Sequence, residues 1–283
     1  MNTATLLITC KDQKGIVATI SNFLYENNGN ILHSDQHHDS DQDIFFMRIE
    51  WSLDNFKVKL NDFDTAFMAI KEKYSIQYQL TQSFEKQRVV IFVSQYDHCL
   101  IDLLNRHKNN ELNGEIIAVI SNHKVTEPLS QFYKIPFYYF DINKDNKAAV
   151  EVKQLELLDS LNVDLIVLAR YMQILSPKFV ESYPQKIINI HHSFLPAFIG
   201  ARPYHQAFER GVKIIGATSH YVTQDLDEGP IIEQGIERVS HRDQVEDLVK
   251  KGRELERVVL SRAVNWHLES RVLSYGNKTI IFD

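Results

Sequence analysis

Hydrophobic and polar positions follow two different periods in the first part of the chain. Strand-like apolar runs occupy residues 4–10, 30–39, 43–51 and 75–82, and apolar residues recur at helical spacing over 11–30 and 63–76. Gly29 and Asn30 are expected to end the first of these helices. The resulting order βαββαβ predicts a ferredoxin-like unit over residues 1–82.

The pattern changes after residue 87. Continuous apolar runs appear at 89–93, 115–121, 164–169 and 186–190, with helical periodicity between them at 100–107 and 148–161. Continuous apolar runs are typical of parallel strands buried on both faces. The sequence therefore predicts a Rossmann-like, doubly wound α/β domain over residues 88–283, joined to the first unit by the polar linker 83–87.

The C-terminal part shows a third pattern of hydrophobic and polar positions. Residues 214–222 and 230–239 are predicted to form antiparallel strands. A helix with a single apolar stripe is expected from about Val245 to Leu268, and a small hairpin is expected to turn at Gly276 and Asn277.

Composition narrows the class of function. The 283 residues carry a net charge of −6, which disfavours nucleic acid as a partner and favours a small-molecule ligand. Only two cysteines occur, so neither a disulfide framework nor a thiolate-rich metal site is expected. The first residues do not match a signal peptide, and no apolar stretch reaches the length of a membrane span. We therefore predict a cytoplasmic protein.

The segment INIHHSFLP, residues 188–196, holds the first candidate site. Side chains alternate along a strand, so Asn189 and His191 are expected to share one face while His192 points to the other, which makes a two-histidine metal site a weak interpretation. Ligands gather at the carboxyl ends of strands in such sheets. An amide that stabilises an oxyanion and an imidazole that moves protons suit acyl transfer, although a plain hydrogen-bonded strand end remains the simpler alternative.

A downstream acidic loop favours the acyl-transfer site over the plain strand end. Residues 223–232, TQDLDEGPII, place Asp225, Asp227 and Glu228 just before a Gly-Pro turn. A carboxylate from this loop could orient the imidazole and stabilise its protonated form. Asp225 and Glu228 fit a solvated turn, and the spacing does not match a calcium loop.

The two motifs together, NIHHSFLP and LDEGP, resemble the folate-dependent formyltransferase superfamily. The resemblance implies that Asn189 binds the formyl oxygen, that His191 is the acid–base group, and that Asp227 holds His191 and positions a water. Residues 168–177, LARYMQILSP, resemble the folate-contacting strand end of that superfamily, although they could equally be core. The pterin would then be bound by Met172, Gln173, Ile174 and Leu175. No metal or cofactor is required.

The first unit distinguishes branches of the superfamily. CKDQKGIVATIS, residues 10–21, resembles the first turn of an ACT domain, a module that pairs with copies of itself and binds small amino acids. The resemblance implies a homo-oligomer and an amino-acid effector that contacts Gly15, Ile16, Asn28, Gly29 and Asn30, residues that are also ordinary turn formers.

The acceptor is inferred from the loop at residues 93–104, VSQYDHCLIDLL. It lacks the glycines of a phosphate loop and contains Asp97, which disfavours a phosphorylated acceptor. The chain resembles the hydrolytic branch, in which water attacks 10-formyltetrahydrofolate and releases formate and tetrahydrofolate, supplying formate for purine biosynthesis and balancing folate pools. Formyl transfer to an unphosphorylated amine is the alternative.

Overall fold

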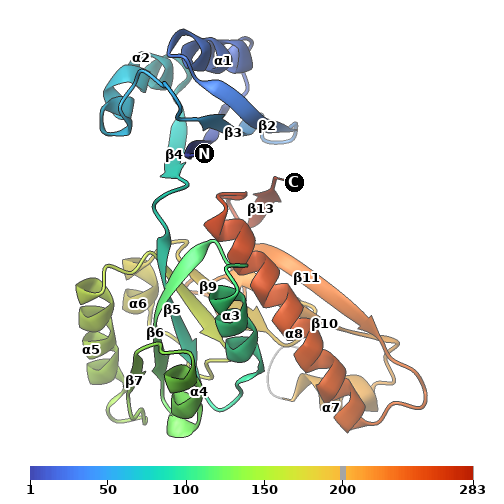
Figure 1. Cartoon of the computed structure of the whole chain (residues 1–283). Helices are drawn as coiled ribbons and strands as arrows, with labels where there is room; N and C mark the ends of the chain where they lie inside the picture. The colour runs from blue at the N-terminus through green and yellow to red at the C-terminus, as the bar shows by residue number, and fades with distance from the viewer. Residues whose placement is uncertain (198–201, 283) are drawn as a thin grey trace. The chain divides into compact units, whose positions relative to one another are not determined.

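The computed structural model describes residues 1–197 and 202–282, which form two compact units (Figure 1). The second unit comprises Gln87–Glu269 and Ser274–Thr279; the first comprises Met1–Lys86, Ser270–Leu273 and the described residues from Ile280 on. The predicted range 88–283 assigned every C-terminal residue to the second domain, which differs from this division. The side chain of Arg48 explains the difference, since its Nε donates to the carbonyl of Ser270 at 3.0 Å.

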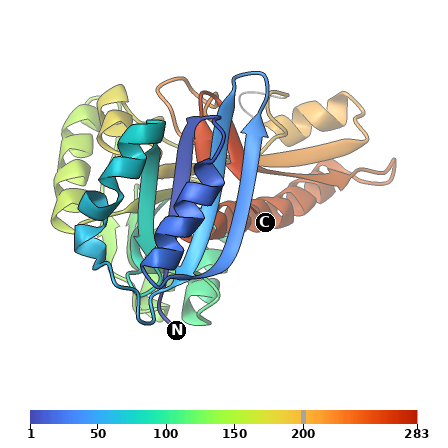
Figure 2. The same cartoon turned by 90° about the horizontal axis from the view of Figure 1, so that it is seen from above.

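The first unit has the predicted βαββαβ order, and its four strands form one antiparallel sheet in the order β2-β3-β1-β4. Its elements are β1 (Thr3–Lys11), α1 (Ile16–Glu26), β2 (Asn30–Asp39), β3 (Ile44–Ser52), the short η1 (Leu60–Asp62), α2 (Phe63–Tyr74) and β4 (Gln77–Gln82). Helices α1 and α2 cover one face of the sheet, as Figure 2 shows from above. Leu6 and Trp51 from the sheet meet Ile20 and Phe67 from the helices in a core where all four are fully buried.

The second unit is built on a seven-stranded sheet in the order β11-β10-β9-β8-β5-β6-β7. Its strands are β5 (Gln87–Val93), β6 (Gly114–Ser121), β7 (Phe137–Tyr139), β8 (Leu165–Ala169), β9 (Ile187–His191), β10 (Ile214–Tyr221) and β11 (Ile231–Arg238). The five strands from β7 to β9 in that order are parallel, and β10 and β11 are antiparallel, as their sequence predicted.

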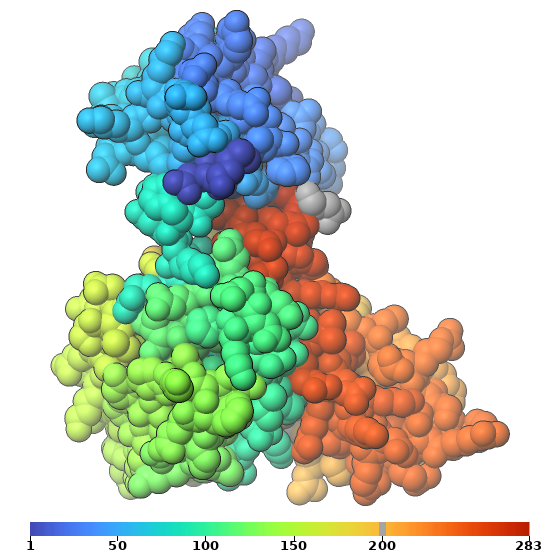
Figure 3. All heavy atoms as spheres, in the orientation of Figure 1, coloured from blue at the N-terminus to red at the C-terminus, as the bar shows by residue number. Residues whose placement is uncertain are grey.

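Helices cover both faces of this sheet. They are α3 (His98–Lys108), η2 (Lys124–Thr126), α4 (Glu127–Phe132), α5 (Lys147–Ser160), α6 (Pro177–Ser182), α7 (Pro203–Glu209) and α8 (Val245–Leu268). Leu158 of α5 and Phe179 of α6 pack with Phe92 of β5. Helices α3 and α8 contact each other, and their surfaces adjoin in the space-filling view (Figure 3). They cover the opposite face. A Cβ on Gly114 would contact both Leu268 of α8 and Val89 of β5. Because side chains alternate along a strand, Val89 points to the face opposite to that of Phe92.

Six short elements were not predicted: β7, α4, α6, α7 and the two single-turn helices η1 and η2. Each has three to seven residues, which is too short for a helical or strand period to be recognised. The long helix α8 and the hairpin of β12 (Val272–Tyr275) and β13 (Lys278–Ile281) confirm the predictions for the C-terminal part. No helix in residues 1–197 or 202–282 combines the length and apolarity needed to cross a bilayer.

The contact between α8 and β10 should make the fold sensitive to acid. Burial, together with the charge of Lys186, lowers the pKa of His267 from 6.5 to about 4, and its Nδ1 accepts the hydroxyl hydrogen of Tyr221 at 2.7 Å. The folded state therefore holds His267 neutral while the unfolded chain protonates it near pH 6.5, so this stability is present above pH 6.5 and is lost as the pH falls towards 4.

We expect the melting temperature of the wild type to fall over this range by more than that of His267→Gln. The glutamine can still accept the hydrogen bond from Tyr221 but does not titrate. The difference should correspond to about 1–3 kcal/mol, or several degrees. His241→Gln, which removes an exposed histidine, is the matched control and should follow the wild type. An identical acid loss in His267→Gln would contradict this assignment.

Candidate active site

One cavity of the second unit lies where β8 and β9 end. It is lined by Leu168, Arg170, Tyr171, Met172, Gln173, Ile174, Leu175, Asn189, Ile190, His191, His192, His220, Val222, Thr223, Gln224, Leu226 and Asp227. The three predicted catalytic side chains are therefore together on the wall of a single cavity. The carboxyl ends of parallel strands are where α/β sheets usually bind ligands.

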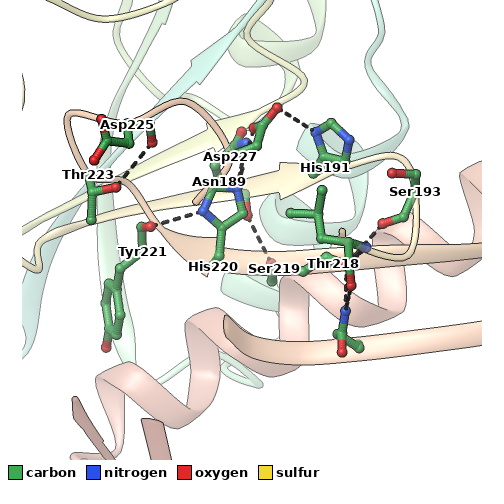
Figure 4. A network of polar contacts seen from close by, with 12 residues as sticks. Asn189, His191, Ser193, Thr218, Ser219, His220, Tyr221, Thr223, Asp225 and Asp227 are labelled. Atoms are coloured by element: carbon green, nitrogen blue, oxygen red, sulfur yellow. Dashed lines mark hydrogen bonds and ion pairs between the residues drawn. The ribbon is translucent and has the colours of Figure 1, made fainter. Parts of the chain in front are cut away.

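Asn189 is oriented by a histidine to which the sequence analysis assigned no role. Asn189 of β9 is the register partner of His220 of β10, and its Nδ2 lies 3.2 Å from His220 Nε2 (Figure 4). The other ring nitrogen, His220 Nδ1, lies 2.9 Å from the carbonyl oxygen of Tyr221 and so carries the hydrogen. Nε2 is then the acceptor, which fixes the amide and leaves one N–H of Asn189 for an oxygen in the cavity.

His191 and Asp227 form an ion pair at the end of β9. Nδ1 of His191 lies 3.2 Å from Oδ2 of Asp227, and the two side chains are 7% and 13% exposed (Figure 4). Burial opposes ionisation of Asp227, but its hydrogen bond and its electrostatic interaction with the His191 imidazole outweigh burial and lower the pKa of this carboxyl. Nε2 of His191 is buried without a hydrogen-bond partner among the described residues. The arrangement leaves this nitrogen available for proton transfer in the cavity.

The loop between β10 and β11 brings Asp227 to His191. Asp227 has a left-handed backbone, with φ 59°. A Cβ on Gly229 would lie 1.8 Å from the carbonyl oxygen of Tyr221, so only glycine permits this close approach of the loop to β10. The same carbonyl anchors His220. Gly229 thus supports both the carboxylate and the imidazole that orients Asn189.

Replacing Gly229 by alanine should displace this loop. We expect Gly229→Ala to lower turnover by about 10²-fold while the chain stays folded, because a shift on the order of 1 Å in a catalytic group has such an effect. Steady-state kinetics with circular dichroism would measure this. Glu228→Ala, which removes an exposed side chain from the same loop, should keep near-normal turnover. Equal activities for the two variants would contradict the role of Gly229.

His192 does not point away from the site, so the expectation from strand alternation is wrong. Strand β9 ends at His191, and His192 lies in the bend that follows, where the period of two no longer applies. His192 lines the same cavity, and its ring centroid is 5.1 Å from that of His191. Burial and the nearby charge of Arg170 lower the pKa of His192 to about 3, so the imidazole is neutral.

The predicted folate-contacting segment also lines the cavity. Met172, Gln173, Ile174 and Leu175 all contribute to its wall, and the side chains of Met172 and Ile174 are 54% and 59% exposed. These two are therefore surface residues of the cavity rather than core. The segment is anchored at both ends, because Met172 N donates to Ser94 Oγ at 2.9 Å and Lys147 Nζ donates to the carbonyl of Ile174.

The five residues predicted to contact an effector separate into two groups. Gly15, with φ 93°, and Ile16 begin α1 and line a hollow in the first unit with Asp12, His37 and His38. Asn28, Gly29 and Asn30 follow the other end of α1, where Gly29 N caps the helix by donating to Leu24 O at 2.7 Å. An 11-residue helix lies between the two groups, so within one chain a small ligand could contact only one of them.

Two clusters in the described part of the chain have metal-binding residue types, and neither includes His191 or Asp227. They are His98, Cys99 and Glu256, and the exposed Asp12, His38 and Asp43. In the buried cluster, Glu256 already binds His98 and the hydroxyl of Tyr204, and burial raises the pKa of the Cys99 thiol well above its usual value. A protonated thiol does not favour a metal.

Three basic side chains of the cavity were given no role from the sequence: His220, His192 and Arg170. Only His220 left a signal in the sequence, as a histidine within an apolar strand directly before the acidic loop. Buried polar residues in strands need partners, and that requirement could have led to Asn189.

Family models match both units. A formyl transferase model matches residues 87–264, and an ACT domain model matches residues 4–52. Among solved structures, a formyltetrahydrofolate deformylase from Pseudomonas syringae pv. tomato has a TM-score of 0.98 and 47% identity, with 100% of this chain and 95% of that chain covered. Glycinamide ribonucleotide transformylase 1 from Symbiobacterium toebii has a TM-score of 0.66 and 30% identity, with 70% of this chain and 95% of that chain covered.

Curated relatives agree over nearly the full length. The formyltetrahydrofolate deformylase of Bacillus subtilis is 54% identical over 279 residues, which is 98% of this chain and 93% of the relative. That of Synechocystis is 52% identical over 280 residues, which is 99% of this chain and 98% of the relative. The chain belongs to the formyltetrahydrofolate deformylase family, with an ACT domain ahead of its formyl transferase domain.

Proposed function

We propose that this enzyme hydrolyses 10-formyltetrahydrofolate to formate and tetrahydrofolate. The observation that carries the proposal is the buried His191–Asp227 pair, whose unpartnered His191 Nε2 shares a cavity with the oriented amide of Asn189. These are a base, a carboxylate that stabilises its protonated form and an oxyanion donor. The names of the relatives support the same reaction.

The chemistry needs one water and no covalent intermediate with the protein. His191 Nε2 takes a proton from the water as its oxygen bonds to the formyl carbon, and Asp227 stabilises the imidazolium that forms. The former carbonyl oxygen becomes an oxyanion that accepts a hydrogen bond from Asn189 and is stabilised by protonated His191. The bond from carbon to N10 then breaks, and His191 returns the proton to N10, which leaves tetrahydrofolate and formic acid. The acid releases its proton to solvent and becomes formate.

The segment Met172–Leu175 is the proposed pterin site. Its exposed apolar side chains could pack against the ring, and its anchored backbone offers N–H and carbonyl groups to the polar edges. This role predicts contacts made mostly by the backbone.

The wider role is proposed from the same reaction. Formate released by the enzyme would supply purine biosynthesis and balance the folate pools, in the cytoplasm. The ACT domain supports a small amino acid as effector, and the hollow beside Gly15 and Ile16 is the better of the two candidate places because it is a concave surface. The ACT domain also supports a homo-oligomer. We propose neither nucleic acid nor a membrane as a partner.

Formate release without any added amine tests the reaction. Purified enzyme incubated with 10-formyltetrahydrofolate alone should release formate and tetrahydrofolate in equal amounts. A transformylase would release formate slowly or not at all until an amine is added. No formate in this assay would reject hydrolysis, and repeating it with a panel of amino acids would test the effector.

A further inference from the structure

Arg170 is a buried cation on the wall of the catalytic cavity. Leu168 of β8 pairs in parallel with Asn189 of β9, and Arg170 and His191 each lie two residues beyond this pair. Arg170 therefore directly follows β8, the strand next to that of the catalytic histidine, and it lines the same cavity. Its side chain is only 10% exposed, and its Nε has no hydrogen-bond partner among the described residues.

The backbone of Arg170 is one that glycine would adopt more easily. Its φ is 62°, in the left-handed region where a Cβ is disfavoured. Strained residues of this kind persist where the surrounding structure holds them, and they concentrate at functional sites. Glycine here would remove the strain but also the side chain that fills this part of the wall.

A buried carboxylate holds that side chain in place. Glu256 of α8 is 1% exposed, and its Oε2 lies 3.5 Å from Arg170 Nε and 2.7 Å from His98 Nε2. Its Oε1 accepts the hydroxyl hydrogen of Tyr204 at 2.6 Å. His98 of α3 and Tyr204 of α7 fix Glu256, so the Arg170 cation that it binds has little freedom to move.

The surroundings of this network are equally tight. A Cβ on Gly252 would lie 2.1 Å from Tyr204 Oη, so Tyr204 packs directly on α8. The guanidinium of Arg170 lies over the Tyr96 ring, 5.3 Å from its centroid. The ring of Tyr204 is next to that of His192, with centroids 6.2 Å apart. This side of the cavity is therefore a packed wall behind His191 and His192.

We propose that Arg170, held by Glu256, determines the acceptor: its side chain fills the space beside His191 in which an amine nucleophile would stand, and leaves room for water. The inference rests on the proposed hydrolysis. In the reaction that Arg170 prevents, the amine nitrogen bonds to the formyl carbon, the bond from that carbon to N10 breaks, and a proton moves from the amine to N10. The products would be a formamide and tetrahydrofolate.

Arg170→Gly tests the proposal, because it empties the space without straining the backbone. Each enzyme is incubated with 10-formyltetrahydrofolate and glycinamide, a small primary amine. Tetrahydrofolate, formate and N-formylglycinamide are then quantified, with enzyme-free reactions subtracted. The wild type should form formate and tetrahydrofolate in equal amounts with and without the amine. In Arg170→Gly the ratio of formamide to formate should be at least about tenfold above the background ratio measured with the wild type.

Two further variants separate volume from charge and guard against misfolding. Arg170→Met keeps most of the side-chain volume without the charge and should keep the wild-type ratio, whereas Arg170→Ala should behave like Arg170→Gly if the glycine variant does not fold. Gln185→Gly is the matched backbone control, since Gln185 is exposed and has φ 57° outside the cavity. It should leave the ratio and the rate unchanged.

Each outcome decides one claim. Wild-type formate release with an unchanged ratio in Arg170→Gly and Arg170→Ala would overturn the inference while hydrolysis stands. A ratio in Arg170→Met as high as that of the glycine variant would overturn it too, because volume would not be the cause. No formate from the wild type would instead reject the proposed function.

Discussion

Asp227→Asn should lower turnover by roughly 10³–10⁴-fold, because removal of the carboxylate from a comparable carboxylate–histidine pair has an effect of this size. An amide in place of the carboxylate lying 3.2 Å from His191 Nδ1 supplies no negative charge to stabilise the imidazolium, and its NH₂ group can favour the wrong tautomer. Asparagine is the right replacement, since it tolerates the left-handed backbone of Asp227 at φ 59°.

Single-turnover formate release measures this loss, and the dissociation constant of tetrahydrofolate shows whether the cavity still binds its ligand. Asp225→Asn is the matched control, because the exposed Asp225 lies in the same loop. Its rate should stay within a factor of about three of the wild type, as expected for a surface substitution. A comparable rate in Asp227→Asn would show that His191 works without the carboxylate.

The second large effect is expected for Asn189→Ala, with turnover lowered by about 10²–10³-fold. His220 Nε2 orients the Asn189 amide at a distance of 3.2 Å. Asn189 is the proposed neutral hydrogen-bond donor to the oxyanion, so alanine removes this donor. The Michaelis constant should change little, because the interaction develops mainly in the transition state.

Circular dichroism and binding of tetrahydrofolate would show whether the Asn189→Ala variant remains folded. Gln173→Ala is a useful comparison, because Gln173 lines the same cavity and is proposed to bind the pterin rather than the oxyanion. Because the pterin contacts are proposed to be made mostly by the backbone, the Gln173→Ala variant should keep both its turnover and its Michaelis constant close to those of the wild type. Near-normal turnover in Asn189→Ala would mean that another group stabilises the oxyanion.

Much of the fold could be predicted because it follows from local periodicity. The alternating and helical patterns of residues 1–82 correspond to the observed βαββαβ sheet, and the continuous apolar runs correspond to the parallel strands β5, β6, β8 and β9. Helix α8 was found because its apolar stripe extends over 24 residues. Elements of three to seven residues contain too few positions for a period, so β7, α4, α6, α7, η1 and η2 were missed.

The sequence by itself determined the longer elements and the position of Asn189 and His191 on one face of one strand, since side-chain alternation is a local property of the backbone. The motif LDEGP had already indicated Asp227 as the partner of His191. Only the tertiary structure added His220, Arg170 and Glu256, and only it showed how Asp227 reaches the site. The antiparallel register of β10 on β9 places His220 opposite Asn189, and Gly229 lets the loop carry Asp227 to His191. Such partners are fixed by non-local packing and close approach, for which no sequence period exists; the same holds for Arg170 and Glu256.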